Sequence, residues 1–106
     1  MADDAATLTG ASLIQSGKVG GSNGPNWNLY GGSGPRNQAI HVQFAKPFRK
    51  APQVSIALYG IDILNSANAR LTVEARNVTA NGFDAVFSTW ADTQVWAAHA
   101  AWLAHE

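Results

Sequence analysis

Apolar and polar side chains alternate with a period of two along three separate stretches of the chain, and this pattern limits the fold more than any other feature. The stretches are residues 40–44, 54–58 and 71–75. Because successive side chains of a β-strand point to opposite faces, each stretch is typical of a strand with one buried face.

Two weaker stretches, residues 13–19 and 83–89, are also predicted to be strands, since turn residues such as the Asn81-Gly82 pair bound them. The last segment, residues 95–106, is ambiguous because its alanines favour a helix. We predict a strand there, since five antiparallel strands need a closing partner and tertiary context often overrides local propensity. The fold class is therefore all-β.

Size and cysteine content limit how this fold is stabilised. A chain of 106 residues makes one domain, residues 1–106, with residues 1–11 expected to be a flexible or irregular N-terminal segment. Cysteine is absent, so neither disulfides nor a thiolate metal site is available, and stability must come from packing or from partner subunits.

The charge balance excludes several classes of partner. Seven basic and seven acidic residues give a net charge of zero, and no basic cluster extends beyond Arg49-Lys50, so we expect no nucleic-acid binding. No apolar run approaches the roughly 20 residues of a membrane span, and the start of the chain has no export signal. We expect a soluble protein without membrane insertion, and the compartment stays open.

A long connection, residues 20–38, contains six of the ten glycines. Such a segment in a compact domain is either a flexible linker or a shaped functional loop. Trp27 and Tyr30 in its middle favour the shaped loop, because aromatic rings dock and glycine lets backbone approach a partner closely. The alternative is a surface loop that Trp27 attaches to the core.

No catalytic or metal-binding constellation is visible. A nucleophile needs a base within reach, and the histidines are scattered at positions 41, 99 and 105. We therefore predict no enzyme, no cofactor and no metal site. Asn77-Val78-Thr79 has the form of a glycosylation acceptor, but a polar turn before Asn81-Gly82 is the favoured interpretation.

Arg70 is the main candidate for binding a ligand. By the period of two it points with Thr72 and Glu74 away from the core face. Its rigid fork of donors suits two adjacent hydroxyls or a carboxylate, which lysine could not match.

Aromatic residues accompany this arginine in the sequence. Trp90 and Trp96 offer large rigid apolar faces of the kind that cover one face of a sugar ring, so the combination indicates carbohydrate. The alternative, which the residues leave open, is that Arg70 pairs with Glu74 or Asp62 and that the tryptophans fill the core.

An ordered series of residues resembles the H-type lectin family from Ile14 to about Trp102. The series is Ile14-Gln15-Ser16-Gly17-Lys18 and Trp27, Phe44, Pro47-Phe48, Pro52-Gln53-Val54, Leu58 and Asp62, Arg70, Asn77-Val78-Thr79, Gly82-Phe83, Thr89-Trp90, Asp92-Thr93 and Trp102. The resemblance implies a six-stranded antiparallel β-sandwich that assembles into trimers. It also implies metal-independent binding of galactose or N-acetylgalactosamine in a cleft between neighbouring subunits.

The resemblance assigns roles to particular residues. It places Arg70 at the family's sugar-binding arginine, Trp90 at an aromatic position beside the site, and Trp96 where the family has tyrosine. Asp62 is expected to be structural or to orient Arg70, and Asp92 is included in the sugar site.

Two departures from the family pattern affect the ligand. Ala91 replaces a histidine that contacts sugar from the neighbouring subunit, and the connection at residues 20–38 contains no acidic residue to accept hydrogen bonds from sugar hydroxyls. Ser33 or Asn37 are the candidate substitutes. A neutral acceptor forms weaker bonds than a carboxylate, so we expect low affinity for a monosaccharide or a different preferred sugar.

The terminal segment is expected to lie at a subunit interface. Trp102 shares a face with Trp96 by even spacing and is expected to be covered by the trimer or by the sandwich interior. Ala98 and Ala100 on that face are expected to let strands of other subunits approach closely. We predict a homotrimer or a dimer of trimers that binds glycans with terminal galactose or N-acetylgalactosamine. The alternative is a trimeric structural or assembly module without sugar binding.

Overall fold

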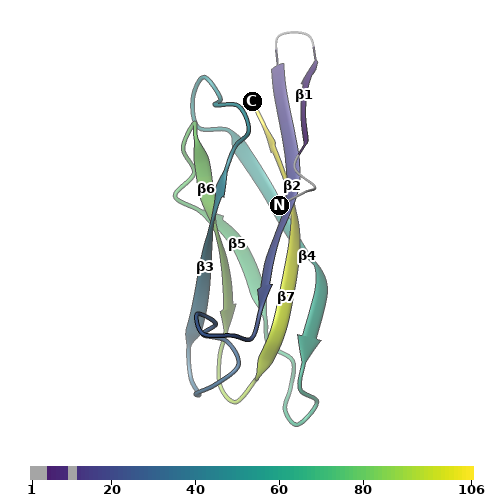
Figure 1. The fold of residues 1–106 in the computed structure, drawn as a ribbon, viewed down its shortest axis with the longest axis vertical. Coiled ribbons are helices and arrows are strands. Elements are labelled where there is room, and N and C mark those ends of the chain that lie inside the picture. Colours follow the sequence, from purple (N-terminus) through teal and green to yellow (C-terminus); the bar gives the residue numbers. More distant parts are fainter. Residues whose placement is uncertain (1–4, 10–11) are drawn as a thin grey trace.

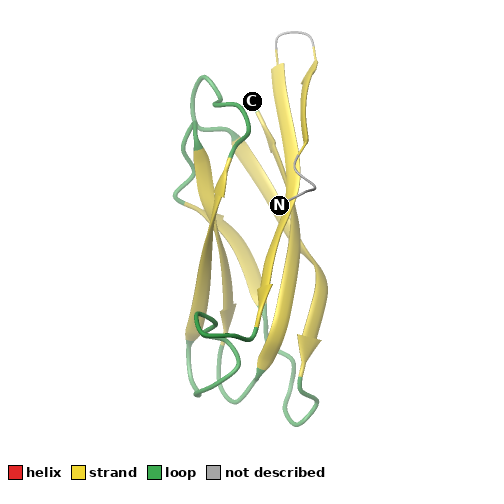
Figure 2. Cartoon of the chain, viewed as in Figure 1, coloured by secondary structure: helices red, strands yellow, loops and turns green. Residues whose placement is uncertain are grey.

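The computed structural model describes residues 5–9 and 12–106, which fold into strands joined by loops and turns (Figure 1 and Figure 2). The described part contains no helix, and hence none that could cross a membrane. The strands are β1 (Ala5–Thr9), β2 (Ser12–Ser22), β3 (Arg36–Gln43), β4 (Gln53–Ile63), β5 (Thr72–Arg76), β6 (Gly82–Thr89) and β7 (Val95–His105).

These strands form two sheets that face each other. One sheet has the order β1-β2-β7-β4 and the other the order β3-β6-β5, with antiparallel pairing throughout. The resulting sandwich measures 50 × 23 × 21 Å, with its strands running along the long axis (Figure 1). The predicted all-β sandwich is confirmed, and its six predicted strands correspond to β2 to β7.

The N-terminal segment differs from the prediction. Residues 1–11 were expected to be irregular, but Ala5–Thr9 forms β1, which pairs with Ser12–Ser16 of β2 in antiparallel register. Residues 1–4 and 10–11 lie outside the described part of the chain. The expectation is therefore wrong for residues 5–9, where an open strand edge offers the backbone hydrogen bonds that a free segment lacks.

The strand prediction for the last segment is confirmed. β7 is a central strand, paired with β2 on one side and with β4 on the other. Ladders on both sides satisfy the peptide groups of β7, and they outweigh the helix propensity of its alanines.

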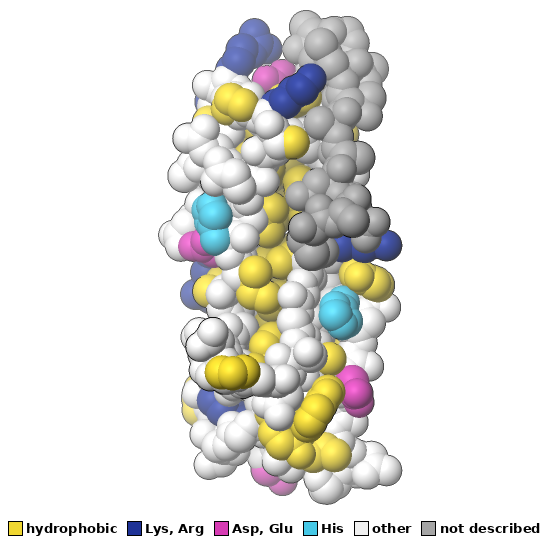
Figure 3. All heavy atoms as spheres, in the orientation of Figure 1, with side chains coloured by type: hydrophobic (Ala, Val, Ile, Leu, Met, Phe, Trp, Pro, Cys, Tyr) yellow, Lys and Arg dark blue, Asp and Glu magenta, His cyan; other side chains and the backbone are white. Residues whose placement is uncertain are grey.

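The core is built around Trp102 and three phenylalanines. The Trp102 ring lies 5.5 Å from that of Phe83 and 5.7 Å from that of Phe44, which in turn packs edge-on against Phe48 at 5.0 Å. Trp102 is therefore covered by the sandwich interior, one of the two predicted alternatives. Seen from the side of β2 and β3, hydrophobic side chains form a band between the two sheets (Figure 3).

Ala98 and Ala100 do not lie where the sequence placed them. Both are fully buried within the subunit's own core. The expectation that they accommodate strands of other subunits is wrong, because the even face of β7 packs against the second sheet of the same chain. Their small size instead leaves room for the large rings of that sheet.

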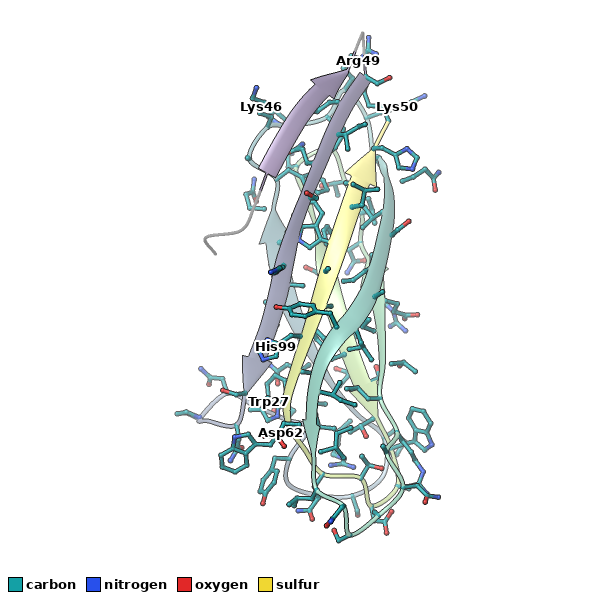
Figure 4. The ribbon with its side chains drawn as sticks, turned by 90° about the vertical axis from the view of Figure 1, so that its right-hand side faces the viewer. Trp27, Lys46, Arg49, Lys50, Asp62 and His99 are labelled. Atoms are coloured by element: carbon teal, nitrogen blue, oxygen red, sulfur yellow. The ribbon has the colours of Figure 1, made fainter. Side chains whose placement is uncertain are left out.

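We call the two ends of the sandwich along its long axis its poles, and different contacts stabilise them. At one pole the buried side chain of Gln15 binds the backbone of Lys46, accepting from its N–H (3.2 Å) and donating to its carbonyl (2.7 Å). At the other pole three connections meet, residues 23–35, 64–71 and 90–94. Figure 4 shows Trp27 and Asp62 at this second pole, and Lys46, Arg49 and Lys50 at the first.

Candidate functional site

The turn between β6 and β7, residues 90–94, is the centre of the second pole. Trp90 begins it with 43% of its surface exposed. Ala91 follows in the left-handed region at φ 57°, which is uncommon for a residue with a side chain. The carbonyl of Ala91 accepts hydrogen bonds from the Gly34 N–H (2.9 Å) and from Arg36 Nη2 (3.0 Å). The glycine-rich connection thus supports this turn from one side.

Arg36 joins that connection to the turn. Its guanidinium donates five hydrogen bonds, all to main-chain carbonyls: Gly34 from Nε at 2.9 Å, Leu29 and Gly31 from Nη1 at 3.3 and 2.9 Å, and Ala91 and Thr93 from Nη2 at 3.0 and 2.9 Å. Each donor is used inside the protein, so Arg36 stabilises the pole. Sequence reasoning missed this residue, and its only signal is an arginine at the end of a glycine-rich segment.

The rest of the connection is a shaped loop rather than a flexible linker. Trp27 Nε1 donates to the carbonyl of Val95 at 2.7 Å, and the Val95 N–H donates to the carbonyl of Leu29 at 2.9 Å. Leu29 is fully buried, and the Asn23 N–H donates to the carbonyl of Trp96 at 2.7 Å. The loop is therefore shaped, and Trp27 attaches it to the core as the alternative interpretation also proposed.

Arg70 holds the opposite side of the same turn. Its Nη1 donates to Asp92 Oδ1 at 3.0 Å and to Thr93 Oγ1 at 3.1 Å. The hydroxyl of Thr93 donates to the carbonyl of Asn68 (2.6 Å), and that of Thr89 donates to the carbonyl of Arg70 itself (2.5 Å). Both threonines are buried. The turn therefore positions the backbone and the side chain of Arg70 together.

Most donors of Arg70 remain available for a ligand. Within the described residues only Nη1 makes hydrogen bonds, which leaves the N–H of Nε and the two N–H groups of Nη2. The side chain is 25% exposed, and that of Asp92 is 75% exposed. A carboxylate that accepts thus lies beside a guanidinium that donates, both open to solvent, which suits a ligand with neighbouring hydroxyl groups.

The alternative pairing of Arg70 is not the one observed. Glu74 pairs with Arg76, and Asp62 lies in β4 opposite Ala97 of β7. Among the described residues the carboxylate partner of Arg70 is Asp92. The suggestion that Asp62 orients the arginine is therefore wrong, because the β6–β7 turn brings Asp92 to the guanidinium.

Two exposed tryptophan rings, those of Trp90 and Trp96, also lie at this pole. Trp96 is 44% exposed and meets Tyr30 edge-on, with ring centroids 5.1 Å apart and an interplanar angle of 87°. Neither Trp90 nor Trp96 fills the core, which settles one alternative left open by the sequence. Ser33 is exposed in the loop, and Asn37 is exposed in β3 opposite Ser88.

Away from this pole, His41, Asp84 and Asn77 form a separate small cluster on the three-stranded sheet. His41 Nδ1 lies 2.9 Å from Asp84 Oδ1, and Asn77 Nδ2 donates to Asp84 Oδ2 at 2.9 Å. The hydrogen bond to Asp84, with a second one to Gln43, raises the pKa of His41, and the bonds from Asn77 and His41 lower the pKa of Asp84. Asn77, at φ 53°, lies in a polar turn. No group of three potential metal ligands occurs in the described part of the chain.

The architecture defines a class of protein before any comparison. A β-sandwich whose loops present an arginine, a carboxylate and exposed aromatic rings at one pole is a binding module. Residues 39–105 match the H-type lectin domain, and the chain belongs to this family of carbohydrate-binding domains.

Individual relatives agree with the family. The chain is 38% identical over 76 residues to a protein of Fuscovulum blasticum described as ATP synthase subunits region ORF 7, covering 72% of this chain and 66% of that protein. It is 37% identical over 82 residues to a discoidin-1 polypeptide of Dictyostelium discoideum, covering 76% of this chain and 32% of that polypeptide. The chain thus spans only part of each.

Solved structures agree on the fold. Discoidin II of Dictyostelium discoideum superposes with a TM-score of 0.81 and 30% identity, over 90% of this chain and 37% of that one. An R1-type pyocin tail fibre has a TM-score of 0.58 at 16% identity, which is a likeness of fold alone.

Proposed function

We propose that this domain binds sugars of the galactose and N-acetylgalactosamine type at the Arg70 pole, without a metal ion. The observation that carries the proposal is the pairing of Arg70 with Asp92, since three N–H donors and an exposed carboxylate lie side by side. Galactose presents two neighbouring hydroxyls on one side of its ring. The guanidinium donates to both, and the carboxylate accepts from one of them.

Trp90 supplies the apolar wall of the proposed site. It is the first residue of the turn that positions Arg70, and its ring is exposed. The C–H groups of one sugar face pack against such a ring, which adds affinity that the hydrogen bonds alone do not supply. Trp96, Asp62, Ser33 and Asn37 are proposed as outlying contacts, because each lies in or beside the connections of this pole.

Asp92 compensates for the acidic residue missing from the glycine-rich loop. The loop carries no aspartate or glutamate, and Ala91 offers only a methyl group where the family pattern has a histidine. Asp92, on the opposite side of the site, keeps one charged acceptor for the sugar. The proposed site still has one sugar contact fewer than the family pattern. We expect weak binding of a single sugar, with useful affinity arising when several sites act together.

Several sites act together if the domain forms a homotrimer, as we also propose. Three weak sites on one assembly gain avidity towards a surface dense in terminal sugars without any new contact. The alternative function is that of an assembly module, in which the same trimeric sandwich binds no sugar.

A glycan array probed with the purified protein separates these two functions. We expect signal on glycans ending in galactose or N-acetylgalactosamine, and the signal should fall when free galactose is added. An array without signal at any glycan, from a protein that sediments as a trimer, would favour the assembly module.

A further inference from the structure

The chain contains two Asn-Gly pairs, Asn23-Gly24 and Asn81-Gly82, and such pairs react without an enzyme where the fold allows it. The backbone nitrogen of the glycine attacks the side-chain carbonyl carbon of the asparagine, and the new C–N bond closes a succinimide ring as ammonia leaves. Water then adds to a ring carbonyl and opens the ring, which leaves aspartate or isoaspartate. Glycine after the asparagine favours this reaction, because no side chain shields its nitrogen and its backbone rotates freely.

The first pair, Asn23-Gly24, lies near the start of the glycine-rich connection and is unconstrained. Both residues are exposed, and both follow the end of β2 at Ser22. Within the described residues neither the Asn23 side chain nor the Gly24 N–H makes a hydrogen bond. A Cβ added to Gly24 would meet nothing beyond its chain neighbours nearer than the Ser22 carbonyl oxygen, at 3.9 Å. The Gly24 nitrogen is therefore free to reach the Asn23 side chain.

The second pair, Asn81-Gly82, is held in place by hydrogen bonds. The Asn81 N–H donates to Thr79 Oγ1 at 3.1 Å, and the Asn81 carbonyl accepts from the Phe44 N–H at 2.9 Å. Gly82 is buried at the start of β6, opposite Gln43 of β3, and its carbonyl accepts from the Thr79 N–H at 2.9 Å. Moving the Gly82 nitrogen onto the Asn81 side chain would disrupt these bonds, so the fold protects this pair.

The unconstrained pair lies at the pole of the proposed sugar site. The Asn23 N–H donates to the carbonyl of Trp96 at 2.7 Å, and the exposed ring of Trp96 meets that of Tyr30. The connection of residues 20–38 contains no aspartate or glutamate. Deamidation of Asn23 would therefore give this loop a carboxylate that its sequence does not encode, on a residue bonded to the strand that carries Trp96.

We infer that Asn23 deamidates spontaneously in the folded protein while Asn81 does not, and that the new carboxylate strengthens glycan binding at this pole. The second part of the inference rests on the proposed function. Aspartate and isoaspartate both carry a negative charge, and a carboxylate accepts hydrogen bonds from hydroxyl groups more strongly than the neutral amide that it replaces. Glycan binding should therefore rise as the protein ages.

Peptide mass spectrometry tests the site of reaction. Trypsin cleaves after lysine and arginine and releases residues 19–36 and 77–106, so the two pairs fall in different peptides. The folded protein is first incubated at mildly alkaline pH, which favours attack by the glycine nitrogen. We expect peptide 19–36 to gain the mass of a hydroxyl in place of an amino group, with fragmentation placing the change at Asn23 rather than at Asn26 or Asn28. Peptide 77–106 should stay unchanged, whereas in urea both peptides should react at similar rates.

Gly24→Ala is the matched control for the chemistry. A Cβ fits at this position without a close contact, so thermal melting should match that of the parent. The added methyl group hinders attack by the backbone nitrogen, although Asn23 itself is retained. We therefore expect peptide 19–36 of Gly24→Ala to keep its mass through the same incubation.

A glycan array tests the consequence for binding. The samples are fresh parent, aged parent, aged Gly24→Ala and fresh Asn23→Asp, which supplies the charge of the product directly. We expect the aged parent and Asn23→Asp to bind glycans ending in galactose several-fold more strongly than the fresh parent. Aged Gly24→Ala should bind as the fresh parent does.

The outcomes distinguish this inference from the proposed function. A folded protein whose peptide 19–36 keeps its mass, or whose two peptides react at the same rate, would overturn the assignment of Asn23. Reaction at Asn23 with equal binding by the fresh parent and Asn23→Asp would overturn the role of the carboxylate and keep the modification site. A parent that binds no glycan, fresh or aged, would refute the lectin proposal, while the peptide masses would still decide whether Asn23 is the modified residue.

Discussion

Arg36 and Arg70 hold opposite sides of one turn, and their hydrogen bonds separate their roles. Arg36 directs every bond at a main-chain carbonyl, whereas Arg70 uses one nitrogen, Nη1, for Asp92 and Thr93. The remaining donors of Arg70 have no partner among the described residues. The same residue type therefore stabilises the loop at one position and offers a ligand contact at the other.

Replacing Arg70 should abolish glycan binding and leave the fold intact. Arg70→Ala removes charge-assisted hydrogen bonds worth about 1.5–3 kcal/mol each, a large share of the affinity of a weak site. Arg70→Lys should fail as well, because a point charge cannot reproduce the fork. Glycan binding and thermal melting measure the two effects.

Arg76→Ala is the matched control for this prediction. Arg76 is an exposed arginine on β5 whose partner is Glu74, so its loss should leave glycan binding unchanged. If Arg70→Ala binds galactose-type glycans as the parent does, the site must lie elsewhere.

The pKa of His41 should lie above that of an ordinary histidine. The hydrogen bond to Asp84 favours the protonated imidazole, so this pair stabilises the fold below the unfolded pKa of histidine. The contribution is lost as pH rises through the folded pKa. The lowered pKa of Asp84 acts in the acid range, where its contribution is lost as pH falls through the folded value.

An NMR titration of the histidine side chains tests this assignment. In Asp84→Asn the pKa of His41 should fall towards its ordinary value. A His41 pKa that is the same in both proteins would contradict the pairing.

At the scale of elements, β7 connects the core to the binding pole. Its even residues from Ala98 to Ala104 are buried between the sheets, and its first residues, Val95 and Trp96, hold the glycine-rich loop. One strand therefore transmits the rigidity of the core to the loops that position the site.

Trp102→Ala should destabilise the protein by about 3–5 kcal/mol, because it removes a buried ring from the aromatic cluster and leaves a cavity. Trp96→Ala on the same strand should cost far less, since that ring is 44% exposed. Urea unfolding of both variants measures the difference. Equal losses would mean that Trp96 packs as a core residue.

Arg36→Ala should loosen the loop at residues 23–35 without unfolding the sandwich. The substitution removes five hydrogen bonds to main-chain carbonyls. Two of these carbonyls, those of Ala91 and Thr93, belong to the turn that positions Arg70. We expect faster amide exchange at Gly34, whose N–H binds the Ala91 carbonyl, and weaker glycan binding. Arg49→Ala, at an exposed position of the opposite pole, is the control and should change neither quantity.

At the scale of the whole molecule, the proposed site lies at one pole, in the connections between strands, while the aromatic core around Trp102 lies between the two sheets. Substitutions in the site should therefore leave the packing of the core unchanged.

Glycan binding should not depend on a metal ion. The proposed contacts are an arginine, a carboxylate and an aromatic ring, and the described residues contain no group of three potential metal ligands. Adding a strong chelator should leave the glycan-array signal unchanged. If the signal disappeared with chelator and returned with calcium, the arginine-centred site would be wrong.

The sequence by itself determined the strands and the surface position of Arg70. Alternation with a period of two is a local property, and together with the turn residues it identified the six strands of the sandwich that the structure shows as β2 to β7. It also placed Arg70 off the core face. Only β1 was missed, since it depends on pairing with the edge of β2.

The tertiary structure alone decided the partners. Asp92 lies 22 residues from Arg70, and the Ala91 carbonyl lies 55 residues from Arg36, so no local pattern records either contact. The burial of Ala98 and Ala100 likewise depends on which face of β7 meets the second sheet. Local periodicity sets which side chains share a face, but only the packing of distant strands sets what that face meets.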